Sequence, residues 1–217
     1  MTSTEVLIVG AGPTGLVLAL WLRRQGVAVR IIDRTDAPGT TSRALAVQAR
    51  TLELYRQLDL ADAVMERGLK VPAVNLWARG VRAARVAFGS IGEHLTPFPF
   101  IEIYPQDEHE RLLIERLMEL GVPVERRTEL TDFTDSGSSV RVELRTVDGK
   151  KESGETRYLA GCDGARSTVR EGLGLGFPGG TYRQVFYVAY IEGGGNQNAA
   201  RPSRAWHRSI KCGGPWP

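Results

Sequence analysis

The N-terminal part of the chain carries a pattern of apolar runs and turn residues that predicts a β-α-β unit. Residues 5–9 form a short apolar run typical of a buried strand, and a second apolar run at residues 27–32 ends at Asp33. Pro13 suits the first turn of an intervening helix and Gly26 suits its end. The apolar positions of that helix share one face: Leu16, Ala19, Leu20 and Leu22. Because a helical crossover joins parallel strands, we expect two parallel neighbours in a twisted sheet.

Further along the chain the periodicity alternates between helical and strand-like. It predicts helices at 47–58, 60–67 and 106–120. It predicts strands at 74–78, 85–88, 122–125, 140–145, 158–162 and 181–192, with an extended piece between Pro97 and Pro105. Asp107 and Glu110 have the spacing of a capping box, and Asp148-Gly149 is a type I′ hairpin signal. Strands and helices that alternate in this way indicate an α/β fold.

Composition narrows the class of protein without identifying it. The chain has 217 residues, of which 42% are hydrophobic and 24% charged, as in globular proteins with a substantial core. No apolar run is long enough to span a membrane, and no signal peptide is visible. Two cysteines outside any paired motif fit a reducing compartment, so we expect a cytoplasmic protein. The three histidines lack metal-ligand spacing, so we expect no metal site.

The formal net charge of +3 comes from the end of the chain. Residues 193–217 contain four basic residues and no acidic one, so residues 1–192 carry about −1. A body this close to neutrality has no nucleic-acid-binding signature.

Three glycines follow the first predicted strand and open the first predicted helix. Gly10, Gly12 and Gly15 have the spacing and context of a turn that binds the phosphates of a dinucleotide. The first glycine permits the tight turn, the second lets backbone N–H groups approach a pyrophosphate, and the third lets the helix pack on the strand. Asp33 follows 21 residues after Gly12, placed to accept both hydroxyls of a ribose. The alternative, that the glycines only shape a turn, explains neither the spacing nor Asp33. The motif does not separate NAD from FAD; Asp33 argues against NADP, although Arg34 beside it weakens that argument.

A second turn follows the predicted strand at 158–162. Asp163-Gly164 comes directly after this strand and precedes Ser167, which can cap a helix that starts near Thr168. Cys162, next to the aspartate, is interpreted as a small core residue rather than a nucleophile.

Together the two turns resemble the flavin-dependent aromatic hydroxylases, the class A monooxygenases. Residues 159–175 look like the motif in which an aspartate at a strand end approaches the flavin side chain beside a nicotinamide-binding surface. The resemblance also covers Ser42-Arg43-Ala44, residues 48–53 and Tyr104-Pro105-Gln106, and extends over about residues 4–192. It implies a Rossmann-like FAD-binding domain with a parallel sheet, followed by the beginning of a second, β-rich substrate domain.

The resemblance also implies domain boundaries. We expect the FAD-binding domain at residues 1–180, with strands near 74–104 contributing to the substrate domain. Residues 181–192 would begin the substrate-domain sheet, and we expect residues 193–217 to be an irregular tail foreign to the family.

Positions that match the family's motifs are implied to contact FAD: Gly10, Gly12, Thr14, Gly15, Asp33, Arg34, Arg43, Gln106, Leu130 and Asp163. The glycines and Thr14 would hold the pyrophosphate. Asp33 would bind the adenosine ribose, with Arg34 beside the adenosine and the Leu130 backbone at the adenine.

The remaining positions are implied to contact the flavin half. Arg43 would reach the flavin phosphate or ribityl region, Gln106 the ribityl chain, and Asp163 the flavin side chain. On the residues alone, Arg43 could also be a solvated loop residue and Gln106 a residue that only starts a helix. Arg50 and Glu53 are interpreted as an ion pair on a helix surface.

The reaction implied by the resemblance begins with reduction of FAD by NADPH or NADH. O₂ would then form a C4a-hydroperoxyflavin, whose distal oxygen is transferred to an electron-rich aromatic substrate. The family's third motif, which begins with Gly-Asp, does not occur in this sequence. We therefore expect a truncated chain that retains FAD weakly, has little or no activity, and self-associates through an unfinished sheet.

Three other interpretations stay open on the sequence. One is a related flavoprotein of the same fold, a halogenase or a prenyl-lipid reductase. Another is a non-catalytic fragment that binds FAD or another nucleotide. The third is an NAD-dependent dehydrogenase, which would leave Asp163-Gly164 unexplained.

Overall fold

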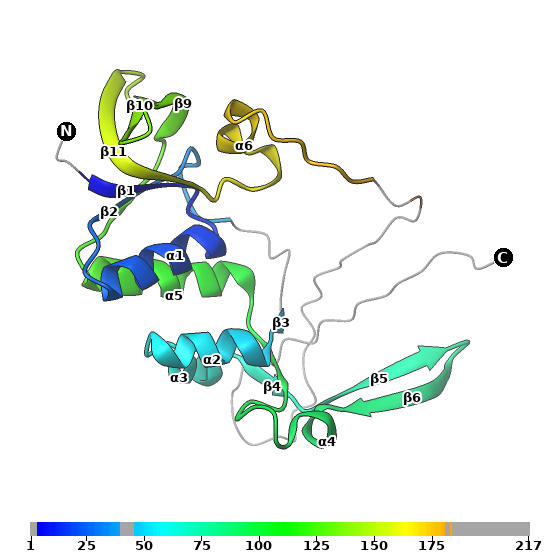
Figure 1. Cartoon of the computed structure of the whole chain (residues 1–217). Coiled ribbons are helices and arrows are strands. Elements are labelled where there is room, and N and C mark those ends of the chain that lie inside the picture. Colours follow the sequence, from blue (N-terminus) through cyan, green and yellow to red (C-terminus); the bar gives the residue numbers. More distant parts are fainter. Residues whose placement is uncertain (1–3, 40–45, 181–182, 184–217) are drawn as a thin grey trace. The chain divides into compact units, whose positions relative to one another are not determined.

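The computed structural model describes residues 4–39, 46–180 and 183, and its central feature is a mixed sheet (Figure 1). Of the two units into which the chain divides, residues 1–176 and 177–217, the first contains all the elements below. Within the described residues the sheet has six strands in the order β8-β2-β1-β11-β10-β9. Their bounds are β1 Thr4–Val9, β2 Val29–Ile32, β8 Val124–Glu125, β9 Glu129–Asp135, β10 Val140–Arg145 and β11 Lys151–Gly161.

Strand β1 lies in the middle of this sheet because both of its faces are apolar. Val6 and Ile8 point into one hydrophobic cluster, whereas Leu7 and Val9 point into the other. Burial on both faces explains an apolar run without alternation. The strand runs parallel to β2 on one side and to β11 on the other. The predicted β-α-β start and the α/β fold are therefore confirmed.

Helices cover the two faces of the sheet. Helices α1 (Pro13–Arg24) and α5 (Gln106–Glu119) lie side by side on one face (Figure 1). Leu16 of α1 and Leu113 of α5 are fully buried there in the larger cluster. On the other face, the short helix α6 (Thr168–Gly172) buries Val169 against β9, β10 and β11.

A smaller group of elements lies within residues 46–103. It contains α2 (Ala49–Gln57), α3 (Ala61–Arg67) and a three-stranded sheet in the order β3-β7-β4. The strands are β3 Ala46–Val47, β4 Leu69–Val71 and β7 Ile101–Ile103. The hairpin β5–β6 (Ala73–Ala78 and Val81–Ala87), the short helix α4 (Phe88–Gly92) and a 3₁₀ turn (Gly164–Arg166) complete the described elements. The second β-rich part of the fold is thus only partial in the described residues.

Two local predictions were wrong for identifiable reasons. The capping box is absent because Pro105 holds the N-cap position and α5 begins at Gln106, so Asp107 is already helical and pairs with Arg111. The Asp148-Gly149 hairpin exists, but only its glycine has a positive φ (75°). The Gly149 N–H donates to the Thr146 carbonyl at 2.8 Å, and the Thr146 N–H donates to the Lys150 carbonyl at 3.0 Å. This is the pattern of a three-residue loop that ends in a glycine, and not of a two-residue type I′ turn.

Other predicted boundaries shifted by a few residues. Val47 belongs to β3 and not to the helix expected at 47–58, and Phe88 starts α4 rather than ending a strand. The predicted strand at 181–192 and the predicted tail at 193–217 lie outside the described residues. None of the helices in the described ranges is long and apolar enough to cross a membrane.

The small sheet contains an unusual buried acid. Glu102 on β7 is 1% exposed, and its Oε1 atom has no hydrogen-bond partner. Its cross-strand neighbours are Val47 and Lys70. Burial raises the pKa of Glu102 to about 7, and the positive charge of Lys70 opposes this rise only in part. The folded chain therefore holds this proton more tightly than the unfolded chain, in which the pKa is near its ordinary value.

Glu102→Gln should change how stability depends on pH. With a pKa of about 7 when folded and 4.5 as the ordinary value, Glu102 reduces the free energy of unfolding as the pH rises from about 4.5 to 7. The loss reaches about 3 kcal/mol above pH 7. Urea unfolding should therefore show Glu102→Gln to be more stable than the unaltered chain at pH 8 and equal to it near pH 4. An equal difference at both pH values would contradict this account; Glu119→Gln, at an exposed site, is the control.

Candidate functional site

The two glycine-containing turns meet at one edge of the sheet. Because β1 and β11 are parallel neighbours, Gly10 and Asp163 follow strands that end side by side. The Cys162 N–H donates to the Val9 carbonyl at 2.7 Å, which carries the pairing past the strand ends. Gly10 has a φ of 103°, and a Cβ on it would lie 2.8 Å from the Asp163 Cα. Only glycine fits at this position, both conformationally and sterically.

The other two glycines of the first turn differ in what surrounds them. A Cβ at Gly15 would overlap the Gly10 carbonyl oxygen and lie 3.2 Å from the Cys162 Cβ, so Gly15 serves packing. Gly12 is the N-cap of α1 in extended backbone, and no heavy atom of the described residues lies within 4 Å of the position of its Cβ. A side chain at Gly12 would therefore enter open space, and Gly12 itself lines the pocket described next.

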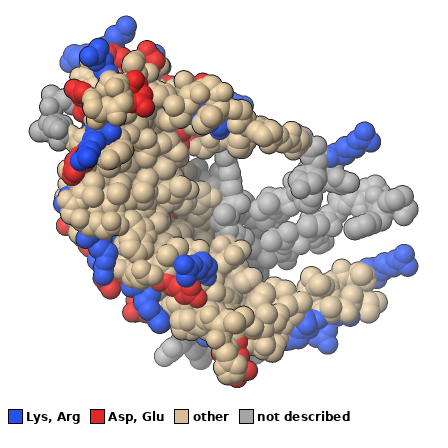
Figure 2. Space-filling model, in the orientation of Figure 1, with Lys and Arg blue, Asp and Glu red and all other residues tan. Residues whose placement is uncertain are grey.

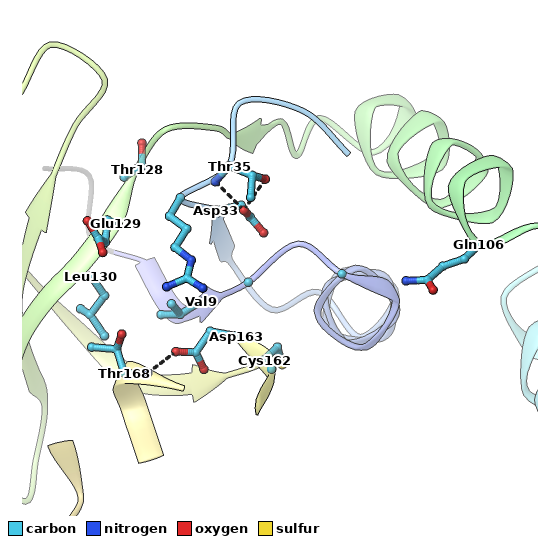
Figure 3. Close-up of a pocket in the computed structure, with 14 residues that line it drawn as sticks. Val9, Asp33, Thr35, Gln106, Thr128, Glu129, Leu130, Cys162, Asp163 and Thr168 are labelled. Carbon is cyan, nitrogen blue, oxygen red and sulfur yellow. Dashed lines mark hydrogen bonds between the residues drawn. The ribbon is translucent and has the colours of Figure 1, made fainter. Parts of the chain in front are cut away.

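A pocket of about 330 Å³ lies between the turns (Figure 3). This volume is near the lower end for small-molecule sites. The pocket is lined by Val9, Gly10, Gly12, Asp33, Arg34, Thr35, Gln106, Thr128, Glu129, Leu130, Cys162, Asp163, Gly164 and Thr168. Both turns, the end of β2, the start of β9 and the start of α5 therefore contribute to one site.

Asp33 is held as a carboxylate at the end of β2. Its Oδ2 accepts a hydrogen bond from the Ala11 N–H at 2.6 Å, and its Oδ1 accepts two from Thr35, one from the N–H and one from the hydroxyl (Figure 3). Burial alone would raise the pKa of Asp33. The Thr35 hydroxyl, the two backbone N–H groups and the charge of Arg126 more than offset burial and lower that pKa below its ordinary value. The site therefore has a fixed anionic acceptor at neutral pH.

Asp163 is oriented by the start of α6. Its Oδ1 accepts a hydrogen bond from the Ser167 hydroxyl and its Oδ2 one from the Thr168 N–H, both at 2.6 Å. Ser167 is the N-cap of α6 and accepts from the Arg170 N–H at 3.0 Å, which confirms the predicted cap. These bonds hold the Asp163 carboxylate at the pocket wall opposite Asp33 (Figure 3).

The structure brings most of the predicted contact residues together. Gly10, Gly12, Asp33, Arg34, Gln106, Leu130 and Asp163 line the pocket. Thr14 and Gly15 lie in the first turn of α1 but do not line it, Thr14 being exposed and Gly15 buried. Arg43 lies outside the described residues. The exposed Arg50 pairs with the half-buried Glu53 at 2.9 Å, which agrees with the interpretation of the two as an ion pair on a helix surface.

Several polar residues of the pocket were missed by sequence reasoning. Thr35 could have been found from its position two residues after Asp33, a common spacing for a side chain that caps a turn. Thr128 and Glu129 could not, because they reach the site through the sheet order and not through any local motif. Arg126 contributes from outside the pocket lining by donating to the Thr35 hydroxyl at 3.1 Å.

The pocket contains no group arranged for nucleophilic or metal chemistry among the described residues. Burial, with a smaller contribution from the Asp163 charge, raises the pKa of the Cys162 thiol, so that it stays protonated at neutral pH. No group of three or more potential metal ligands occurs in the described ranges. The arrangement can bind and orient a ligand that is rich in hydroxyl and phosphate groups.

Comparison with known proteins gives a consistent result. A family model described as an FAD binding domain matches residues 3–195. The chain is 48% identical over 171 residues to 6-methylpretetramide 4-monooxygenase of Streptomyces rimosus, covering 79% of this chain and 30% of that protein.

Solved structures agree with the sequence match. p-Nitrophenol 4-monooxygenase PnpA from Pseudomonas putida DLL-E4 superposes with a TM-score of 0.76 at 25% identity, covering 88% of this chain and 46% of that one. The flavin-dependent monooxygenase PieE, solved with FAD and substrate, gives a TM-score of 0.72 at 28% identity, covering 87% of this chain and 33% of that one. The chain thus spans between about a third and a half of the length of these proteins.

The different surroundings of Gly12 and Gly15 predict that alanine destabilises the fold at position 15 but not at position 12. Gly15→Ala should lower the free energy of unfolding by roughly 3 kcal/mol or more, because its Cβ meets backbone that cannot move aside. Gly12→Ala should leave that free energy unchanged within about 0.5 kcal/mol, since its backbone conformation suits alanine. Chemical denaturation of both variants measures this, and similar losses in the two would contradict the assigned roles.

Proposed function

Because this chain belongs to the FAD-binding domain family of the flavin-dependent monooxygenases, we propose that it binds FAD between its two turns and forms the cofactor-binding part of an aromatic hydroxylase. The resemblance to class A hydroxylases expected from the sequence is confirmed. The observation that carries the proposal is the meeting of the turns after β1 and β11, with Gly12 open toward the pocket.

The residues of the pocket fit the adenosine and pyrophosphate parts of FAD. The carboxylate of Asp33 is an acceptor for the ribose hydroxyls. The backbone N–H groups at the start of α1 suit a pyrophosphate, because the positive end of the helix dipole lies there and Gly12 lets the anion approach. Leu130 would present its backbone to the adenine, with Arg34 beside it.

The flavin half would be held by residues at the other end of the site. Gln106 offers an amide donor and acceptor to the ribityl hydroxyls. Asp163 would bond the flavin side chain, and Arg43, outside the described residues, would reach the phosphate or ribityl region.

The chemistry supplied by bound FAD would be reduction by NADPH or NADH, followed by hydroxylation of an aromatic substrate with O₂. The chain's own residues bind and orient the cofactor, so no acid–base set is required of them. Relatives named for 6-methylpretetramide and p-nitrophenol support an aromatic small molecule as the substrate class.

Measurement of FAD affinity distinguishes a cofactor site from a turn that serves only the fold. The unaltered chain mixed with FAD should quench or enhance flavin fluorescence saturably. Gly12→Ala should weaken this binding by about tenfold or more, because its Cβ takes the space of the pyrophosphate while the fold is unchanged. Fluorescence titration gives both affinities. Equal affinity of the two proteins would contradict the proposed placement of the cofactor. Addition of NADPH to the unaltered chain with FAD under anaerobic conditions separately tests whether the flavin is reduced.

We also propose that the β5–β6 hairpin drives self-association. Trp77 and Val81 are 66% and 68% exposed, and Leu76 is exposed beside them. Basic side chains lie on the same hairpin, at Arg79, Arg82 and Arg85. Figure 2 shows Lys and Arg side chains in the lower part of the view. An exposed apolar two-stranded ribbon is a typical association surface.

Trp77→Ser should reduce association without affecting the core, because the side chain is exposed and its hairpin forms a two-stranded sheet of its own. Sedimentation velocity at several concentrations should show a smaller self-associated fraction for this variant. Unchanged association, or a strictly monomeric unaltered chain, would contradict the assignment of this surface.

A further inference from the structure

Glu110 is a buried acid that the proposed function does not yet use. It lies one helical turn after Gln106 on α5 and is 5% exposed. Glutamate is rarely buried to this extent, because a carboxylate loses its hydration unless the protein replaces it with hydrogen bonds. Its partners therefore indicate what the residue does.

The two oxygens of Glu110 accept from different parts of the site. Oε1 accepts from the Nε2 amide of Gln106 at 2.9 Å, and Oε2 accepts from the Gly39 N–H at 3.4 Å. Gly39 belongs to the loop that leaves β2 at Asp33. Glu110 thus joins the loop that follows Asp33 to the side chain of Gln106, and both Asp33 and Gln106 line the pocket.

The bond to Gln106 has a directional consequence. A glutamine side chain carries a donor end and an acceptor end, whereas a carboxylate can only accept. Glu110 therefore selects the orientation of the Gln106 amide in which the NH₂ group faces the carboxylate. The carbonyl oxygen of Gln106 is then the end of the amide that faces away from the Glu110 carboxylate.

We propose that Glu110 is a positioning residue for the cofactor. It orients the amide of Gln106 toward the ribityl hydroxyls of FAD and ties that amide to the loop that begins at Asp33. The proposal rests on FAD binding as the proposed function. A buried carboxylate that accepts from both segments sets the spacing between the adenosine and ribityl contacts before the cofactor arrives.

The test compares FAD with ADP, which has the adenosine and pyrophosphate groups but no ribityl chain or flavin. Affinities of both are measured by calorimetry for the unaltered chain, Glu110→Ala, Glu110→Gln, Gln106→Ala and the double variant Glu110→Ala/Gln106→Ala. Glu119→Gln on the exposed side of the same helix is the control. Glu110→Gln keeps an acceptor for Gln106 but loses one for Gly39.

A positioning role predicts that Glu110→Ala weakens FAD binding by about tenfold while ADP binding changes by less than about twofold. Glu110→Gln should recover part of the FAD affinity. Gln106→Ala should weaken FAD selectively, and adding Glu110→Ala to it should have little further effect, because the two residues act as one unit. Equal losses for FAD and ADP, or additive losses in the double variant, would overturn the proposal.

The side-chain amide of Gln106 gives a readout that does not need the cofactor. In ¹⁵N-correlated spectra, Glu110→Ala should shift and broaden this resonance, whereas Glu119→Gln should leave it unchanged. An unmoved Gln106 amide would overturn the proposal even if FAD binds. Failure of the unaltered chain to bind FAD while this amide does respond would instead overturn the proposed function.

Discussion

The architecture of the site depends on the close parallel pairing of β1 with β11. The pairing continues past the strand ends through the Cys162 N–H and the Val9 carbonyl, and it brings the backbone of Gly10 against that of Cys162 and Asp163. No Cβ fits at Gly10, and the φ of 103° also requires glycine. This contact joins two chain segments about 150 residues apart and lets their turns form a single pocket at one edge of the sheet.

The acids of the pocket are oriented by the backbone that this contact positions. Asp33 accepts from the Ala11 N–H in the first turn, and Asp163 accepts from the Thr168 N–H after the second. Each carboxylate is thereby fixed before any ligand binds, which reduces the entropy lost on binding. Glu110 extends the same arrangement to the start of α5 through its hydrogen bond with Gln106. The Thr35 and Thr168 bonds are local to their turns, whereas the Ala11–Asp33 bond depends on the pairing of β1 with β2.

Much of the fold near the site could be predicted from the sequence, because its signals are local. The β-α-β start follows from apolar periodicity and from Pro13, and Ser167 was recognisable as a cap. The capping box failed because Pro105 moved the helix start, a competition that spacing alone does not reveal. Thr128 and Glu129 in the pocket, and the buried Glu110, could not be predicted, since their surroundings arise from strand order and helix packing. The association of Asp163 with Gly10 was inferred from a resemblance to a family and not from periodicity.

Amide chemical-shift mapping during a titration with FAD tests whether the two turns form one cofactor site. If they do, the amides of residues 10–12, 14–16, 33–35 and 163–168 should shift together along one saturation curve. Amides of the β5–β6 hairpin should remain in place. Shifts confined to one of the two turns, or centred on the hairpin, would contradict a single site.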